Sequence, residues 1–143
     1  MEHSNTHLAF SPPVVAHLSA AYDLLSNERN RLRARWISKY VGRQYLDNTS
    51  REAASLDPYF FSDLQLTYDW KPEFMGKISF SVLLRNVLDA RFSTNAWTYR
   101  YISSFDARPS DPYAQLEQGN TYNLTGFFPQ AGRNVMVRLG LEF

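Results

Sequence analysis

The last stretch of the chain, residues 134–143, alternates strictly between apolar positions and positions that are mostly polar or small. Its apolar positions are Val135, Val137, Leu139, Leu141 and Phe143. Successive side chains of a β-strand point to opposite faces, so this two-residue period predicts a strand with one apolar face. The predicted strand ends at a C-terminal Phe.

Four earlier stretches repeat the same period, at residues 14–25, 31–41, 59–70 and 77–87. Each is about as long as the 9–11 residues, roughly, that cross a bilayer at a tilt. The connections between the five stretches run short, long, short, long, which is typical of outer-membrane barrels with short periplasmic turns and long outer loops. We therefore predict an all-β fold, an antiparallel meander of about five transmembrane strands, with residues 88–133 as its longest outer loop.

Charged residues gather on the polar face of these predicted strands. The charges expected to face a wet barrel lumen are Asp23, Arg31, Arg33, Arg35, Asp69, Lys77, Arg138 and Glu142. Antiparallel neighbours would compensate one another. The predicted pairs are Asp23–Arg33, Arg31–Asp69, Asp69–Lys77 and Lys77–Glu142. A solvated face of a soluble sheet also carries mixed charges, so the pattern alone leaves both interpretations open.

Composition removes several classes of function. The net charge of +1 gives no reason to expect nucleic acid, and the absence of Cys excludes disulfides and thiolate metal sites. The mean hydropathy of -0.41 is typical of a soluble protein, but polar lumen residues lower this average in any barrel. His3 and His7 have helical ligand spacing without an acidic partner, so we expect neither a metal nor a cofactor.

The chain contains no catalytic motif that we identify, neither a nucleophile elbow, a zinc-protease signature nor a phosphate-binding glycine loop, so an enzyme is not expected. The loop at 88–133 is rich in aromatic residues. Trp97, Tyr99 and Tyr101 alternate and would share one strand face beyond the membrane. They are our candidate ligand-binding residues, by stacking; the alternative is an aromatic girdle or packing of the loop. Arg133, beside Gly132, is expected to have a structural role.

Four segments in order resemble TonB-dependent outer-membrane receptors. Residues 38–49 (SKYVGRQYLDNT) resemble the top of a late barrel strand in that family. Asn86-Val87-Leu88-Asp89 resembles the motif that ends the penultimate strand, and residues 128–134 (FPQAGRN) resemble the segment that leads into the last strand. The C-terminal Phe143 resembles the family's assembly signal, which the apolar positions from Val135 onward complete.

The resemblance extends from about Leu8 to Phe143 and covers only the end of a barrel of about 22 strands. The plug domain, the TonB-interacting segment and the signal peptide have no counterpart, so we expect residues 1–143 to be a fragment of a receptor. The implied function is uptake of a scarce ligand (a siderophore, haem, cobalamin or glycan) with TonB-derived energy. The implied partners are outer-membrane lipid, the barrel-assembly machinery and, through the missing N-terminal part, TonB.

Two other interpretations stay open at this point. A small porin-like barrel needs about eight strands, so residues 1–13 and 90–128 would have to supply three more. A soluble β-sandwich that binds sugar or protein would bury the apolar faces between two sheets. The sequence does not identify a ligand under any of these interpretations.

Overall fold

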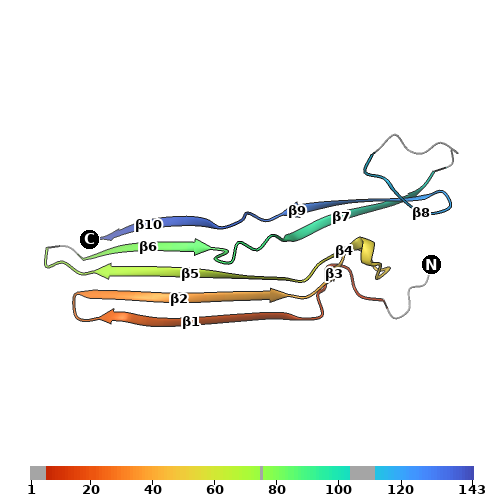
Figure 1. Cartoon of the computed structure of the whole chain (residues 1–143). Helices are drawn as coiled ribbons and strands as arrows, with labels where there is room; N and C mark the ends of the chain where they lie inside the picture. Colours follow the sequence, from red (N-terminus) through yellow and green to blue (C-terminus); the bar gives the residue numbers. More distant parts are fainter. Residues whose placement is uncertain (1–5, 75, 104–111) are drawn as a thin grey trace. The chain divides into compact units, whose positions relative to one another are not determined.

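The computed structural model describes residues 6–74, 76–103 and 112–143, and it consists of antiparallel β-sheets (Figure 1). His3 lies outside the described residues. The chain divides into two units. We call residues 14–41, 59–91 and 131–143 the long-sheet unit, and residues 1–13, 42–58 and 92–130 the insertion unit.

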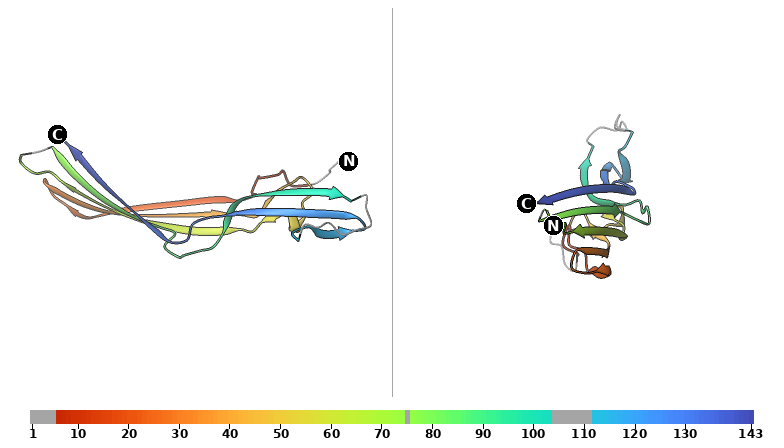
Figure 2. Two further views of the ribbon diagram at one scale, coloured as in Figure 1. Left: turned by 90° about the horizontal axis from the view of Figure 1, so that it is seen from above. Right: turned by 90° about the vertical axis from the view of Figure 1, so that its left-hand side faces the viewer.

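The long-sheet unit is one five-stranded sheet with the order β1-β2-β5-β6-β10. Its strands twist against one another (Figure 2). They are β1 (Val15–Ser26), β2 (Asn30–Val41), β5 (Tyr59–Trp70), β6 (Lys77–Arg85) and β10 (Asn134–Glu142). The five predicted strands are thereby confirmed, with ends that differ by at most two residues. The largest difference is at β6, which ends at Arg85 because Asn86 adopts a positive φ of 50° and turns the chain.

Local hydrogen bonds close the first short turn, between β1 and β2. Asn27 Oδ1 accepts hydrogen bonds from the backbone N–H groups of Arg29 at 3.1 Å and Asn30 at 2.8 Å. An Asn side chain that bonds the backbone a few residues later is a common turn device. The Lys71 N–H, at the start of the second short turn, donates to the Arg29 carbonyl at 2.8 Å. The two short turns therefore support each other at one end of the sheet.

The observed register tests the predicted charge pairs. Asp23 lies opposite Arg33, Arg31 opposite Asp69, and Lys77 opposite Glu142, as predicted. The predicted Asp69–Lys77 pair is wrong. β5 and β6 place Ser79 opposite Asp69, and the Ser79 hydroxyl donates a hydrogen bond of 2.6 Å to that carboxylate.

The insertion unit contains two smaller sheets. One pairs β3 (Gln44–Tyr45) with β4 (Ser55–Leu56), which follows the short 3-10 helix η1 (Glu52–Ala54). The other has the order β7-β9-β8, with β7 (Ser93–Ile102), β8 (Gln115–Gln118) and β9 (Thr121–Pro129). The prediction of one long loop at 88–133 is therefore wrong over much of its length. The error arose because the face of β7 and β9 that packs inward carries Thr and Asn, which hides an apolar period.

Candidate functional site

One whole face of the long sheet is apolar and exposed. Val137 and Leu139 of β10 are 62% and 65% exposed, and Tyr22 of β1 is 73% exposed. The exposed large side chains of this face are Leu18, Tyr22, Trp36, Tyr40, Phe60, Leu66, Tyr68, Trp70, Phe80, Val135, Val137, Leu139 and Leu141. Monomeric soluble proteins seldom expose so continuous an apolar surface. This face is therefore a candidate surface for contact with lipid or with another protein.

On β5 the apolar face carries aromatic side chains at both ends and aliphatic ones between them, whereas on β2 Trp36 lies opposite Leu64, in the middle. Phe60 lies near one end, Leu64 and Leu66 lie in the middle, and Tyr68 and Trp70 lie at the other end. The ten residue steps from Phe60 to Trp70 span about 33 Å of strand. At a barrel tilt of about 40° this length covers roughly 25 Å of membrane thickness, the height of the apolar band in outer-membrane barrels.

Neighbouring strands repeat this distribution at both ends. Tyr40 lies opposite Phe60, and Phe80 lies opposite Tyr68. The Tyr68 hydroxyl donates a hydrogen bond of 2.6 Å to Asn30 Oδ1, at the edge of the apolar zone. A ring with an apolar body and a polar tip suits the boundary between hydrocarbon and water.

Two serines interrupt the apolar face, and both are buried. Ser38 and Ser62 are 7% and 1% exposed, and their hydroxyls share a hydrogen bond of 2.8 Å. The Trp36 indole N–H donates to the Ser38 hydroxyl at 2.8 Å. These hydrogen bonds satisfy the polar atoms of the two serines within the apolar face. The exposed side chains around the serines are apolar. Sequence reasoning missed this pair, although both serines occupy apolar-face positions in the alternation.

The opposite face of the long sheet is polar and charged. Asp23 forms ion pairs with Arg31 at 2.9 Å and with Arg33 at 2.8 Å. On the same face, between β6 and β10, Lys77 pairs with Glu142 at 3.5 Å. Of the predicted lumen charges, these five are brought together in pairs or clusters. The others bond to neutral partners or line a depression, as described next.

Two open depressions lie on this polar face, and Gln65 and Thr67 line both. One also contains Arg31, Arg33, Arg35 and Asp69, and the other contains Lys77, Arg138 and Glu142. The Arg35 guanidinium donates to the Ser19 hydroxyl at 3.0 Å. Charges of both signs with many hydroxyl and amide groups suit contact with water, ions or another polar protein surface. Nothing in this arrangement resembles an acid–base pair or a nucleophile with its base.

The three predicted ligand-binding residues share one face of β7. Trp97 and Tyr99 are 47% and 61% exposed, and Tyr101 stacks between Tyr99 and Tyr122, at 5.7 Å and 5.6 Å between ring centroids. Gly126 lies opposite Trp97, and a Cβ atom there would overlap the indole. The common face is therefore as predicted, whereas ligand binding by it stays a prediction.

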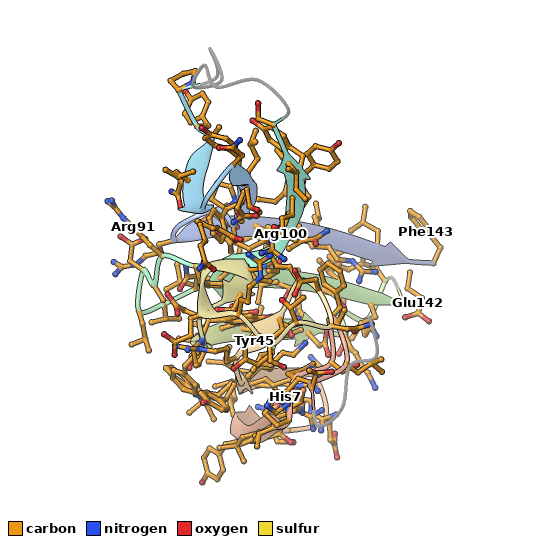
Figure 3. All side chains as sticks on the ribbon, turned by 90° about the vertical axis from the view of Figure 1, so that its right-hand side faces the viewer. His7, Tyr45, Arg91, Arg100, Glu142 and Phe143 are labelled. Atoms are coloured by element: carbon orange, nitrogen blue, oxygen red, sulfur yellow. The ribbon has the colours of Figure 1, made fainter. Side chains whose placement is uncertain are left out.

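The other face of β7 carries an ion-pair network that sequence reasoning missed. Glu117 of β8 pairs with Arg51. It also pairs, at 2.8 Å, with Arg100 of β7; Arg100 is labelled in Figure 3. Arg51 also pairs with Asp47 at 3.0 Å. Nearby, Leu46, Ala54, Leu56 and Ala96 form a small buried cluster. This network joins the segment 42–58 to the β7-β9-β8 sheet within the insertion unit.

The environment of Asp47 in this network alters the acidity of its carboxyl group. Partial burial raises its pKa, but hydrogen bonds from Thr49 and from the Arg51 guanidinium outweigh this effect. The pKa of Asp47 therefore lies below its ordinary value, and the folded insertion unit favours the charged carboxylate.

His7, a member of the histidine pair considered above, is held by an aromatic neighbour. Its ring stacks on Tyr45 with 5.0 Å between centroids, and its backbone N–H donates to Ser50 Oγ at 2.8 Å (Figure 3). In the part of the chain that the structure describes, no three His, Cys, Asp or Glu side chains are grouped so as to hold a metal ion.

Comparison with known protein families, with curated proteins and with solved structures returned no match. Within the described ranges, no helix is both long enough and apolar enough to cross a membrane.

Proposed function

We propose that this chain forms closing strands of the barrel of a TonB-dependent receptor, with the long sheet crossing the outer membrane. The observation that carries the proposal is the pair of opposite faces of this sheet. One face is apolar and exposed, and the other has clustered charges around Asp23 and between Lys77 and Glu142. Lipid outside and water inside account for both faces at once.

The unpaired edges of the five-stranded sheet favour a barrel that contains further strands. β1 and β10 are its outer strands, and each pairs with only one neighbour among the described residues. A strand in lipid must satisfy its backbone groups on both sides, so open edges are not tolerated there. Further strands of the same receptor would pair with both edges, in line with the resemblance to receptors of about 22 strands. In vesicles that hold this chain alone, other copies of the chain would have to pair with its edges.

The strand connections support an orientation. The two long connections, 42–58 and 86–133, leave the same end of the sheet, and both short turns lie at the other end. In outer-membrane barrels the long loops are external and the short turns periplasmic. The aromatic face with Trp97, Tyr99 and Tyr101 would then be available outside the cell to a scarce ligand.

The proposed role is thus transport, with no catalytic step and no cofactor. Energy would come from TonB acting on an N-terminal plug, and this chain would supply lumen wall and outer loops. Its other partners would be membrane lipid and the barrel-assembly machinery, which would recognise the last strand through Val135, Val137, Leu139, Leu141 and Phe143.

The three tryptophans provide a test without added probes. We expect acyl chains that carry bromine to quench Trp36 and Trp70, which lie on the apolar face, and to leave Trp97 of the insertion unit unquenched. Single-Trp variants, with Phe at the other two positions, would be folded in vesicles of brominated and ordinary phospholipid. Equal quenching of all three, or none of any, would contradict the proposal. A monomeric elution volume without detergent would favour a β-sandwich instead.

A further inference from the structure

The turn that follows β6 is built around a buried asparagine. Asn86 is 4% exposed and has a φ of 50°, and Asp89 has a φ of 53°. Asn and Asp adopt this left-handed conformation more readily than other residues with side chains. The Asn86 side chain closes the turn, because it donates to the Ala90 carbonyl at 2.8 Å and accepts from the Ala90 N–H at 2.9 Å.

The same turn is attached to β5. The Asn86 N–H donates to Asp63 Oδ1 at 2.8 Å, and the Val87 N–H donates to the Ser62 carbonyl at 2.7 Å. The regular pairing of β5 with β6 ends at Leu64 and Leu84. These two bonds therefore continue the attachment of the chain to β5 beyond the last regular pair, and they fix the position of the turn on the sheet.

The turn also holds the segment that leads into β10. Asp89 Oδ1 accepts a hydrogen bond of 2.8 Å from the Arg133 backbone N–H. Gly132 lies against the same oxygen, because a Cβ atom on it would be 2.8 Å from Asp89 Oδ1. Such a distance is closer than real Cβ contacts, so only glycine allows this approach without a shift.

We propose that Asn86, Asp89 and Gly132 form a clip that sets the register of β10 on β6. Strands in a hairpin take their register from the turn that joins them. β6 and β10 have no such turn, since residues 86–133 separate them in sequence. The clip contacts Arg133 directly before the first pair of the ladder, Asn134 with Arg85, and so replaces the missing turn.

The side-chain pattern of β10 cannot set its register on β6 alone. A slip by one residue would exchange the apolar and polar faces and is strongly disfavoured. A slip by two residues keeps each side chain on its face, since Met136, Arg138 and Gly140 all lie on the polar side. Selection among registers that differ by two residues therefore requires a fixed point, and the Asp89–Arg133 bond is one. This role does not depend on the proposed transport function.

Disulfide cross-linking in the full chain tests the clip, because the chain has no natural Cys. Ser81→Cys with Arg138→Cys reports the observed register, in which these residues are partners. Ser81→Cys with Met136→Cys, or with Gly140→Cys, reports a slip by two. We expect the observed register to dominate in the parent chain. Asp89→Ala should raise the ratio of slipped to in-register product roughly tenfold, the factor that loss of one charge-assisted hydrogen bond brings.

Two control variants keep the bond. Asp89→Asn retains an acceptor oxygen without its charge, and Arg133→Ala retains the donor N–H. Arg133→Ala should leave the ratio near its parent value, and Asp89→Asn should raise it much less than Asp89→Ala does. Gly132→Ala should raise the ratio, because its Cβ displaces Asp89. The clip is refuted if Asp89→Ala leaves the ratio unchanged or if Arg133→Ala raises it equally. If Asp89→Ala does not fold, equal ratios in Gly132→Ala and Asp89→Asn refute it instead.

Discussion

Adjacent residues of the long sheet occupy opposite environments, as Leu66 and Thr67 of β5 illustrate. Leu66 is 39% exposed on the apolar face, between Ala34 and Val82. Thr67 lies on the polar face, where its hydroxyl is 3.2 Å from that of Ser81. Both side chains are partly accessible. What distinguishes them is therefore the medium that each face contacts, which a substitution can measure.

Replacement of Leu66 by Arg places a charge near the middle of the proposed lipid face. We expect Leu66→Arg to lower the free energy of unfolding in lipid vesicles by about 2–4 kcal/mol, the cost of Arg at the bilayer midplane. Thr67→Arg is the matched control, and it should lower stability by about 1 kcal/mol at most, because its face is wet and only repulsion by Arg33 opposite opposes it. Urea unfolding in vesicles measures both. Equal small effects at the two positions would indicate that water contacts both faces.

At the scale of elements, the long strands and the insertion differ in how they are stabilised. The five long strands depend on a ladder of backbone bonds and on the medium at their apolar face. The segment 42–58 depends on specific polar contacts, of which Arg51 makes several, with Asp47, Thr49 and Glu117. The insertion should therefore respond to pH through the carboxylate of Asp47.

The lowered pKa of Asp47 means that acid should destabilise the insertion unit. Because folding favours the charged carboxylate, its contribution to stability is complete above the unfolded pKa of about 3.9 and is lost as the pH falls through the lower folded value. We expect hydrogen-exchange protection of residues 47–54 to stay constant down to about pH 4 and to fall below it. Asp47→Asn should reduce protection at neutral pH and flatten the acid response. Identical pH profiles for the two chains would contradict this assignment.

The difference between the long strands and the insertion also explains which elements could be predicted from the sequence. β1, β2, β5, β6 and β10 could be, because their period of two continues for nine to twelve residues. β7 could be predicted only from Trp97 to Tyr101, and β9 could not be predicted, because Thr98 and Asn123 occupy inward positions and bond to each other at 2.9 Å. β3, β4 and β8 are too short to show a period.

The functional surfaces divide in a similar way. The two faces of the long sheet, and the common face of Trp97, Tyr99 and Tyr101, follow from alternation alone. The Ser38–Ser62 pair and the Glu117 network depend on partners far apart in sequence, so no local pattern signals them. The predicted Asp69–Lys77 pair was wrong for a related reason, since the register of β5 on β6 decides which residue lies opposite Asp69.

For the whole molecule, we propose that lipid contacts one face of the long sheet and water contacts the other. Leu139 and Arg138 test it most directly, because they are neighbours in β10, both exposed, and belong to opposite faces. A nitroxide would be attached at Leu139→Cys or at Arg138→Cys in the membrane-inserted chain. Its relaxation by oxygen, which concentrates in hydrocarbon, would be compared with relaxation by a water-soluble nickel complex.

We expect relaxation by oxygen to dominate at position 139 and relaxation by the nickel complex to dominate at position 138. Equal accessibility at both positions, or the reverse order, would show that lipid and water do not divide between the two faces.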